Sequence, residues 1–277
     1  MRLCTFRRGA DPRPVPGLLD GDEIRRLAAP SLLDYLAGGL VAPVAESYRR
    51  GEVTLLAPIP EPPSIRDFFA FEQHVATTRA RRGQPVPPFW YEAPVFYFTN
   101  PSAVCGPDVP VPYPAGTSML DFELEVAAVI GADQRIAGFT VLNDWSARDL
   151  QRAETSVGLG PAKGKDFATS MGPVLVTVDE FDGRSGAMTA TVNGAELSYG
   201  DLAAMHYSWE ALRRRAVENT RLRPGDVLGS GTVGTGCILE QETQNWLRPG
   251  DVVELTVSGI GTLRNTVGPP RTPEGVL

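Results

Sequence analysis

The sequence predicts a mostly β protein of the α+β class, with a small N-terminal module over residues 1–58 and a larger domain over residues 59–277. Residues 64–277 are rich in β-branched runs separated by Gly or Pro turns, and few segments carry a helical pattern. The stretch PIPEPP at 58–63 is typical of an extended linker. A chain of 277 residues can bury a full core, as one large unit or as a large and a small one.

The N-terminal module is expected to open with a short strand. Helix-like segments follow at 22–28 and 30–37, and the second begins with Pro30, which the first turn of a helix tolerates. A polar stretch at 46–52 then leads into the apolar residues 53–57. Together these features predict a module of mixed α and β structure.

In the larger domain, helices are expected at 66–82, 146–154 and 208–218, and most of the remainder is expected to form strands and turns. The pair Asn193-Gly194 predicts a two-residue hairpin turn. The sequence LRPGDV occurs at 222–227 and again at 247–252, and its central Pro-Gly predicts a turn in both places.

A glycine-rich segment, GSGTVG at 229–234, has the letters of a dinucleotide-binding fingerprint. The residues after it continue as loop and strand, whereas that fingerprint opens a helix within a βαβ unit. We therefore expect a loop whose glycines allow close approach of the backbone.

Composition limits the function classes. The chain has 26 basic and 33 acidic residues and a net charge of -7, which opposes binding to nucleic acid and to anionic membranes. We expect no signal peptide and no membrane span, because no apolar run approaches ~20 residues. The three cysteines are far apart, which favours free thiols and a reducing, cytoplasmic compartment.

Acidic residues are arranged in an unusual pattern. In DFELE at 121–125, apolar and acidic residues alternate, as in a half-buried strand, so Glu123 and Glu125 share one face about 7 Å apart. Asp144 follows the apolar run 139–142. Three carboxylates that converge from two strands would suit Mg²⁺, Ca²⁺ or Mn²⁺. Taken separately, the alternating acids would more often be a solvated strand face and Asp144 a helix cap.

Five motifs in order resemble the fumarylacetoacetate hydrolase family over residues 64–265. They are RDFF at 66–69 with His74, DFELE at 121–125, NDWSARD at 143–149, GKDF at 164–167, and SGT at 230–232 with GCILE at 236–240. The resemblance implies a mixed β-sandwich roll, a divalent metal held by carboxylates and, in most members, a homodimer. It also implies small 2-oxo or 1,3-dicarbonyl acids as substrates and makes residues 59–277 the catalytic domain.

The resemblance also assigns candidate site residues by motif. One divalent cation, with Mg²⁺ preferred over Mn²⁺ or Ca²⁺, is expected on four carboxylates. The metal set is Asp67, Glu123, Glu125 and Asp144; the catalytic set is His74, Glu240 and Lys165; the substrate-binding set is Arg148, Gln151, Tyr97 and Thr232. Hydrolases of the family carry an arginine shortly after the histidine, and here Arg79, Arg81 and Arg82 all compete for that role without matching its spacing.

The chemistry of these residue types agrees with the resemblance. A hard cation polarises a dicarbonyl and stabilises the charge left when a C–C bond breaks. A histidine with an ordinary pKa near ~6.5 can take a proton from water, and Glu240 can orient its ring. Cys237 is expected to be a small apolar filler.

Each candidate has a plain structural interpretation as well. In that interpretation Arg148 pairs on a helix surface with Asp144 or Asp149, Lys165 lies in a solvated turn, Tyr97 is strand core, and Glu240 ends an exposed strand.

The sequence therefore predicts a metal-dependent hydrolase that cleaves a C–C bond in a 1,3-diketo acid, an acylpyruvate or a fumarylacetoacetate-like compound, with water activated by His74 and Glu240. One alternative is an oxaloacetate-type decarboxylase or keto–enol tautomerase, in which the metal does most of the chemistry. Another, from a different class, is a non-catalytic protein that binds a metabolite.

Overall fold

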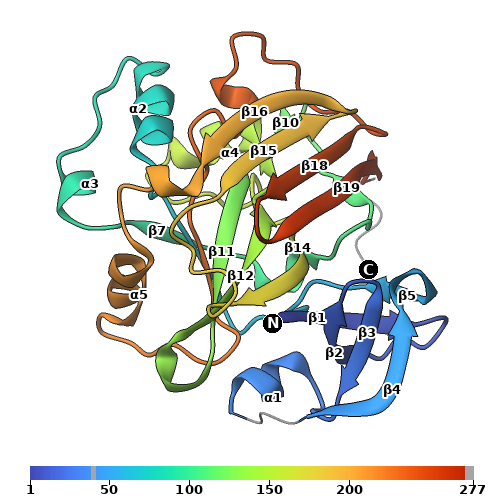
Figure 1. Ribbon diagram of the computed structural model, residues 1–277. Coiled ribbons are helices and arrows are strands. Elements are labelled where there is room, and N and C mark those ends of the chain that lie inside the picture. Colours follow the sequence, from blue (N-terminus) through green and yellow to red (C-terminus); the bar gives the residue numbers. More distant parts are fainter. Residues whose placement is uncertain (39–41, 272–277) are drawn as a thin grey trace.

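The computed structural model describes residues 1–38 and 42–271. Within them, two β-sheets pack face to face with helices around the outside, so the prediction of a mostly β, α+β fold is confirmed. Figure 1 shows the larger sheet running from the N-terminal module into the centre of the molecule, with the second sheet beside it. None of the described helices is long and apolar enough to cross a bilayer.

The larger sheet contains ten strands along one hydrogen-bonded path. In spatial order they are β4 (Pro43–Arg49), β3 (Glu23–Leu27), β2 (Val15–Asp20), β1 (Arg2–Arg8), β14 (Thr169–Thr177), β12 (Ile136–Asn143), β11 (Leu124–Ile130), β17 (Val227–Gly229), β6 (Ile65–Phe68) and β7 (Phe96–Thr99). Two short strands join this path from the side, β5 (Val53–Leu55) on β1 and β8 (Val104–Cys105) on β14. The candidate site lies on the adjacent strands β12, β11, β17 and β6.

The second sheet has the order β16 (Ala195–Asp201), β15 (Ala187–Val192), β18 (Val252–Val257), β19 (Gly261–Pro270) and β9 (Val111–Tyr113). A separate two-stranded pair joins β10 (Leu120–Asp121) to β13 (Ser146–Ala147). The helices are α1 (Leu32–Leu36), α2 (Glu72–Ala80), α3 (Phe89–Glu92), α4 (Arg148–Thr155) and α5 (Trp209–Val217), and one short 3₁₀ turn, η5 (Ile238–Glu240), matters for the site.

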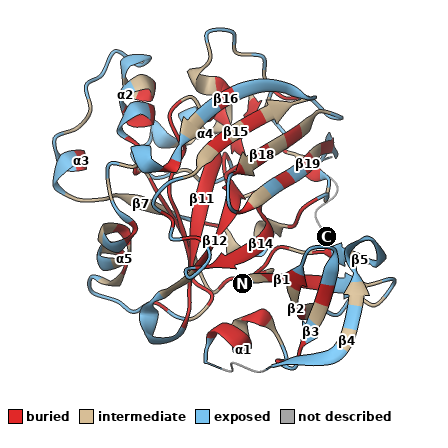
Figure 2. Ribbon diagram, viewed as in Figure 1, coloured by how far each residue is buried: buried red, intermediate tan, exposed pale blue. Residues whose placement is uncertain are grey.

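The core fills the space between the two sheets. Val141 of β12 lies in one buried cluster with Leu255 of β18 and Leu263 of β19. The opposite face of the large sheet is covered in part by α1, whose Leu32 and Leu36 belong to a second buried cluster. Figure 2 shows β11, β12 and β14 buried along most of their length. Each such aliphatic side chain stabilises the fold by about 1.5–3 kcal/mol, so the central strands form a rigid base.

The predicted helix at 22–28 is wrong, because β3 occupies this region and pairs with β2 and β4. Gly21 and Asp22 form a two-residue hairpin loop with φ +58° at Gly21, a turn signal that outweighs local helical periodicity. Ile24 and Leu27 are buried against the sheet. The second predicted helix exists as the shorter α1, whose N-cap is Ser31, which accepts from the Asp34 amide.

In the larger domain the predicted helix at 66–82 is half wrong, since β6 precedes α2, and β13 precedes α4 where a continuous helix was expected at 146–154. The helix at 208–218 is confirmed as α5, with Ser208 as its cap. The hairpin is also confirmed, with Val192 opposite Ala195 and positive φ at Asn193 and Gly194.

Both predicted Pro-Gly turns have a glycine with positive φ, at Gly225 (+84°) and Gly250 (+95°). The division of the chain at residue 58 stays a prediction. Strand β1 pairs with β2 inside the proposed module and with β14 outside it, so the large sheet continues across the proposed boundary.

Candidate active site

Four buried carboxylates gather at one end of the central strands. Asp67 comes from β6, Glu123 from the link between β10 and β11, Glu125 from β11, and Asp144 from the end of β12. Each is at most 5% exposed, and one carboxylate oxygen from each lies within 4.8 Å of the others. The strand order β12-β11-β17-β6 explains the convergence, because all four elements are neighbours in the sheet.

Glycine at position 229 makes this approach possible. Gly229 pairs with Asp67 on one side and with Ala127 on the other, and a Cβ there would lie 2.3 Å from Asp67 Oδ1. Gly231 has φ +79°, and its Cβ would lie 2.4 Å from the carbonyl oxygen of Phe68. The glycine-rich segment is thus the close-approach loop that its sequence context predicted.

The acidic strand differs from its prediction in one respect. The alternating stretch is interrupted at Phe122 and Glu123, where the Glu123 amide donates to Asn143 Oδ1 at 2.9 Å. Both faces are buried, so the expectation of a half-buried strand is wrong, and so is the interpretation as a solvated acidic face. Strands covered on both sides lose the contrast between a wet and a dry face that alternation normally reports.

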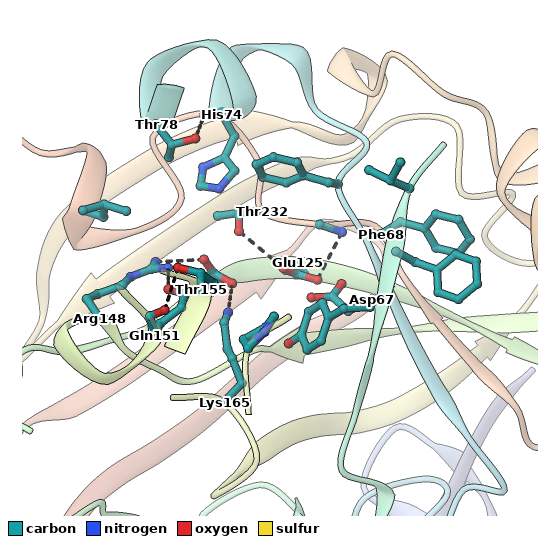
Figure 3. A pocket seen from close by; sticks show the side chains of 18 of the residues that line it. Asp67, Phe68, His74, Thr78, Glu125, Arg148, Gln151, Thr155, Lys165 and Thr232 are labelled. Carbon is teal, nitrogen blue, oxygen red and sulfur yellow. Dashed lines mark hydrogen bonds and ion pairs between the residues drawn. The ribbon is translucent and has the colours of Figure 1, made fainter. Parts of the chain in front are cut away.

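Two buried cations partly balance the acidic cluster. The Lys165 ammonium lies 2.6 Å from Glu123 Oε2 and 2.5 Å from Asp144 Oδ2. The Arg148 guanidinium contacts Glu123 at 2.8 Å and Asp121 at 2.7 Å. The expected partners of Arg148, Asp144 and Asp149, are wrong, and Lys165 is 3% exposed rather than solvated. In Figure 3, Arg148 extends toward the centre of the site from the left and Lys165 from below.

Burial and mutual repulsion set the charge state of the cluster. Burial, reinforced by Asp144, raises the pKa of Asp67 well above its usual range, and burial beside Asp67 does the same to the pKa of Glu125. Burial also opposes ionisation of Glu123, yet Lys165 and Arg148 together hold its pKa below its usual value. Glu123 is therefore the member of the cluster that is favoured in its ionised form, whereas Asp67 and Glu125 are favoured in their protonated forms.

The donor set fits a hard divalent cation. Among the described residues, Asp67 Oδ1 and Asp144 Oδ1 are buried oxygens with no hydrogen-bond partner, a costly state for a carboxylate. Oxygen-only ligands with several carboxylates are what Mg²⁺, Mn²⁺ and Ca²⁺ prefer. A cation between these four groups would remove the repulsion that raises the pKa values of Asp67 and Glu125.

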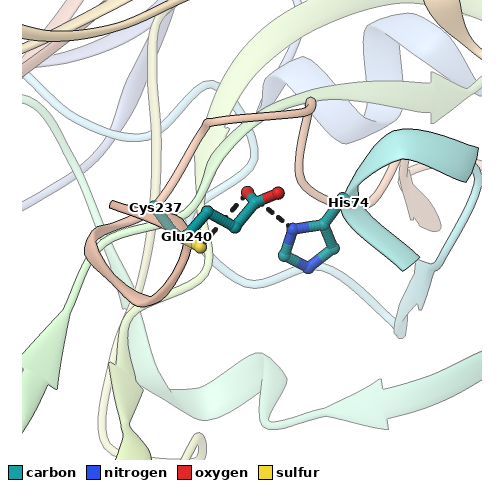
Figure 4. Close-up of side chains that lie close together, drawn as sticks. All are labelled: His74, Cys237 and Glu240. Atoms are coloured by element: carbon teal, nitrogen blue, oxygen red, sulfur yellow. Dashed lines mark hydrogen bonds and ion pairs between the residues drawn. The ribbon is translucent and has the colours of Figure 1, made fainter. Parts of the chain in front are cut away.

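A buried histidine–carboxylate pair lies beside the cluster. His74 Nδ1 of α2 is 2.8 Å from Glu240 Oε2 of η5, and both side chains are at most 4% exposed. Figure 4 shows the imidazole facing Glu240, with the Cys237 sulfur on the other side of the carboxylate. Burial raises the pKa of the Cys237 thiol well above its ordinary value, in keeping with its predicted role as a filler.

Asp121 has a role that the sequence did not indicate. It accepts from the amides of Ile238 and Leu239, at 2.7 and 3.0 Å, and so anchors the turn that carries Glu240. It also accepts from Arg148 Nε at 2.7 Å. Asp121 therefore links the histidine pair to the cations beside the acidic cluster. It lies inside a recognised motif, but only the tertiary arrangement separates its role from that of Glu123.

These groups surround one cavity of about 350 Å³. Nine of the predicted residues line it, while Asp144 and Glu240 lie behind the wall, against Lys165 and His74. Tyr97 donates its hydroxyl to Asp144 Oδ2 at 2.5 Å, and Thr232 donates to Glu125 Oε1 at 3.4 Å, so both residues predicted to contact substrate also hold acids of the cluster.

The three arginines that compete for one role, Arg79, Arg81 and Arg82, differ in what they contact. Arg81 donates to the backbone oxygens of Glu240 and Gln241, at 2.8 and 3.0 Å, and so supports the turn. Arg79 and Arg82 line the same cavity as the acidic cluster, and we call the part that they line the outer cavity. Burial, followed by the nearby Arg79 and Arg148, lowers the pKa of Arg82. No ion pair among the described residues joins Arg79 or Arg82 to a carboxylate, so the outer cavity is cationic.

The fold and the site together define a β-sandwich protein with a buried carboxylate site for a cation and an adjacent histidine–glutamate pair. The family model described as "Fumarylacetoacetate (FAA) hydrolase C-terminal" matches residues 64–268. The chain belongs to the fumarylacetoacetate hydrolase family. Members of this family are enzymes that act on small molecules, and they bind a divalent metal.

Several relatives are similar over nearly the whole chain. A mitochondrial oxaloacetate tautomerase of Xenopus laevis is 31% identical over 96% of this chain and 90% of its own length. A 2,4-didehydro-3-deoxy-L-rhamnonate hydrolase of Sphingomonas is 30% identical over 96% of both chains. The chain spans only 57% of the length of a rice fumarylacetoacetase to which it is 30% identical.

Solved structures agree on the fold. The crystal structure of a 5-carboxymethyl-2-hydroxymuconate delta-isomerase from Mycobacterium smegmatis matches with a TM-score of 0.78 at 28% identity, over 97% of this chain and 100% of that one. A fumarylacetoacetate hydrolase from Exiguobacterium antarcticum has the same TM-score of 0.78 at 24% identity, over 98% of this chain and 100% of that one, which supports the fold alone.

Proposed function

We propose that the protein is a divalent-metal-dependent hydrolase that cleaves a C–C bond in a 1,3-diketo acid. The observation that carries the proposal is the buried His74–Glu240 pair, 2.8 Å apart, beside a four-carboxylate cluster in one cavity. A tautomerase or decarboxylase needs the cation and a proton carrier. Hydrolysis also needs a base that activates water, and this pair has the composition of one.

The four carboxylates Asp67, Glu123, Glu125 and Asp144 would hold the cation. When bound, the cation would polarise the carbonyl oxygens of the oxo acid and stabilise the negative charge that develops there. The preference for Mg²⁺ over Mn²⁺ or Ca²⁺ stays a prediction, since all three accept carboxylate oxygens.

His74 would act as the general base. With a proton on Nδ1 donated to Glu240, its Nε2 is left to accept a proton from water. The hydroxide adds to the acyl carbonyl, the C–C bond breaks to release a carboxylic acid and an enolate, and the proton held by His74 returns to the enolate carbon to give the 2-oxo acid. Glu240 orients the ring and stabilises the charge that His74 acquires.

Lys165 and Arg148 would contact the anionic groups of the substrate. Lys165 has three N–H donors and uses two of them, on Glu123 and Asp144, so one is left for the cavity. Gln151, which contacts Arg148 at 3.3 Å, with Tyr97 and Thr232, completes the polar lining on the substrate side. These substrate roles are the ones that the resemblance to the family motifs predicts.

A keto–enol tautomerase of oxaloacetate-like acids is the second candidate. The similarity to the oxaloacetate tautomerases of Xenopus laevis and of Bacillus subtilis, each 31% identical, favours it specifically. A decarboxylase would use the same cation site. The non-catalytic alternative is the weakest, because members of the family are enzymes.

A product assay tests the proposal. Purified protein is incubated with Mg²⁺ or Mn²⁺ and with acylpyruvates, fumarylacetoacetate or oxaloacetate, and products are identified by mass. Release of a carboxylic acid together with pyruvate from an acylpyruvate, or of fumarate together with acetoacetate from fumarylacetoacetate, supports the hydrolase. Carbon dioxide, or an enol–keto change in an unaltered skeleton, identifies the alternatives, and tight binding without turnover would identify a metabolite-binding protein.

A further inference from the structure

Three residues separate the end of β6, which carries Asp67, from α2, which carries His74, and the first two of them are Phe69 and Ala70. Three distant parts of the chain hold their backbone. The Trp90 indole N–H donates to the Phe69 oxygen at 2.7 Å, and the His206 amide donates to the Ala70 oxygen at 2.9 Å. The Ala70 amide donates to the Ser230 oxygen at 3.0 Å. This connection is therefore fixed from outside.

The groups that hold it form a compact aromatic cluster. Trp90 is 3% exposed, and its ring centroid lies 4.8 Å from that of His206, which lies 4.7 Å from that of Tyr207. The Tyr207 hydroxyl donates to the Trp90 backbone oxygen. We call Trp90, His206 and Tyr207 the Trp90 cluster.

The Trp90 cluster also reaches the start of α2 through its neighbours. Tyr91 donates to Glu72 Oε1 at 2.7 Å, and Glu72 Oε2 lies 3.7 Å from His206 Nδ1. Glu72 is the first residue of α2, two residues before His74. None of these residues is among those that line the described cavity. The Trp90 cluster therefore contacts the N-terminal end of α2 and does not line the cavity.

Phe69 passes the constraint to His74. Its ring meets the imidazole edge-on, with centroids 5.3 Å apart and an interplanar angle of 85°. On the other side, the backbone of Gly231 packs so closely against the Phe68 carbonyl oxygen that a Cβ would not fit between them. A shift of the connection would thus move His74 relative to both Glu240 and the acids, and a misplacement of about 1 Å can cost about 100-fold in rate.

We propose that Trp90 and Tyr207, with His206, are positioning residues that fix His74 relative to Asp67 through the backbone of Phe69 and Ala70. This inference rests on the proposed role of His74 as the base. It assigns a function to an aromatic cluster that makes no contact with the cavity.

The chain offers a matched pair of variants. Trp90→Phe keeps the aromatic packing and removes the single donor to Phe69. Trp209→Phe removes an equivalent bond, from an indole to the Gly183 oxygen at 2.9 Å, in a tryptophan that is 8% exposed and whose ring packs against Phe139 instead. If Trp90→Phe does not fold, Tyr207→Phe carries the test, because it removes only one hydroxyl.

The first readout needs no activity. The chain has only two histidines, so the imidazole NMR spectrum of histidine-labelled protein contains two sets of signals, and the set that is missing from a His74→Ala sample belongs to His74. Trp90→Phe and Tyr207→Phe are expected to shift the His74 signals, and Trp209→Phe is expected to leave them in place. Unmoved His74 signals in both Trp90→Phe and Tyr207→Phe would overturn the proposal.

The second readout is kinetic. Trp90→Phe is expected to lower kcat about tenfold, with KM and Mg²⁺ affinity within about twofold of the original protein, because geometry and not binding is lost. In a His74→Ala background the same change should have no further effect on kcat. A loss that persists there contradicts positioning through His74. If His74→Ala alone leaves the rate unchanged, the proposed function fails, while the NMR comparison still decides whether the Trp90 cluster positions the ring.

Discussion

His74 and Glu240 form a buried pair, with 2.8 Å between Nδ1 and Oε2, although 165 residues lie between them in the chain. Their carriers are held independently. The Phe69–Ala70 connection fixes α2, and Asp121 and Arg81 fix the turn of Glu240. A pair built from two such anchored elements is already ordered before a substrate arrives, which is what general-base catalysis requires.

Replacing His74 by Ala is expected to lower kcat for hydrolysis by about 10²–10⁴-fold, the usual contribution of a general base. Mg²⁺ affinity should remain nearly unchanged, because His74 is not one of the proposed ligands. Steady-state kinetics and calorimetric Mg²⁺ titration measure the two quantities. Glu240→Gln should lower kcat in the same direction, and the double variant should be little worse than His74→Ala alone. A His74→Ala protein with the original rate would favour the tautomerase or decarboxylase.

Replacing Glu123 by Gln is expected to abolish metal-dependent activity. Glu123 is the acid that Lys165 and Arg148 keep ionised, so its loss removes the cluster's most secure negative charge. Loss of a residue that only supports a metal ligand typically lowers metal affinity about 10–100-fold, and the loss of Glu123 as a ligand should lower Mg²⁺ affinity by more than this. The solvent-exposed Asp22→Asn, of equal chemistry, serves as control. Full activity of Glu123→Gln after chelation and return of Mg²⁺ would remove Glu123 from the ligand set.

The predictable part of this site lies in short motifs, and the rest depends on long-range packing. Asp67, Glu123, Glu125 and Asp144 could be grouped from motif and strand pattern, and they do converge. The burial of both faces of 121–125 could not be foreseen, because the segment 231–239, which contacts Glu125 and Asp121, lies more than 100 positions away in the sequence.

Asp121 and Trp90 show the same limit. Each acts by hydrogen-bonding to backbone atoms of a distant segment, N–H groups for Asp121 and a carbonyl oxygen for Trp90, and backbone groups leave no trace in the residue types of that segment. The strand β3 was mistaken for a helix for a related reason, since its pairing with β2 and β4 outweighs its local pattern.

A homodimer stays a prediction that rests on the family resemblance. The expected mass in light scattering at micromolar concentration is about 60 kDa, twice the chain mass of 29.8 kDa. A single species at the chain mass over that concentration range would contradict it. Sedimentation velocity on the same samples would separate a dimer from an elongated monomer.

Metal binding is expected to depend on pH through Asp67 and Glu125. Their pKa values are raised well above the ordinary 3.8 and 4.5, mainly by burial, so in the metal-free protein they retain protons that the unfolded chain has released. The unfolded state then binds fewer protons, and their contribution to stability declines as pH rises from those ordinary values toward the raised ones. A cation takes the place of the retained protons, so its binding releases them and strengthens with pH.

The gain in Tm on adding Mg²⁺ should therefore widen between about pH 5 and pH 8. Thermal unfolding with Mg²⁺ and with a chelator measures it, and titration calorimetry in buffers of different ionisation enthalpy counts the protons released. Asp22→Asn should show the same trend as the original protein, whereas Glu125→Gln should flatten it. A gain in Tm that narrows with rising pH would contradict the charge assignment.

The outer cavity predicts a preference for substrates with a second carboxylate, far from the cation. Arg82 and Arg79 line that region, while Arg81 is occupied by the backbone of Glu240 and Gln241. Burial, followed by the nearby Arg79 and Arg148, lowers the pKa of Arg82, and an anionic substrate group beside it would favour its charged form. Arg82→Gln should raise KM for a diketo acid with a distal carboxylate about tenfold, since a charge-assisted hydrogen bond contributes about 1.5–3 kcal/mol and the side chain is partly exposed. KM for an acylpyruvate with a neutral methyl end should change less than about twofold by the same reasoning.

The control is Arg214→Gln, an exposed arginine of α5 away from the cavity. Equal increases of KM for both substrates would show that Arg82 shapes the cavity without recognising the distal group.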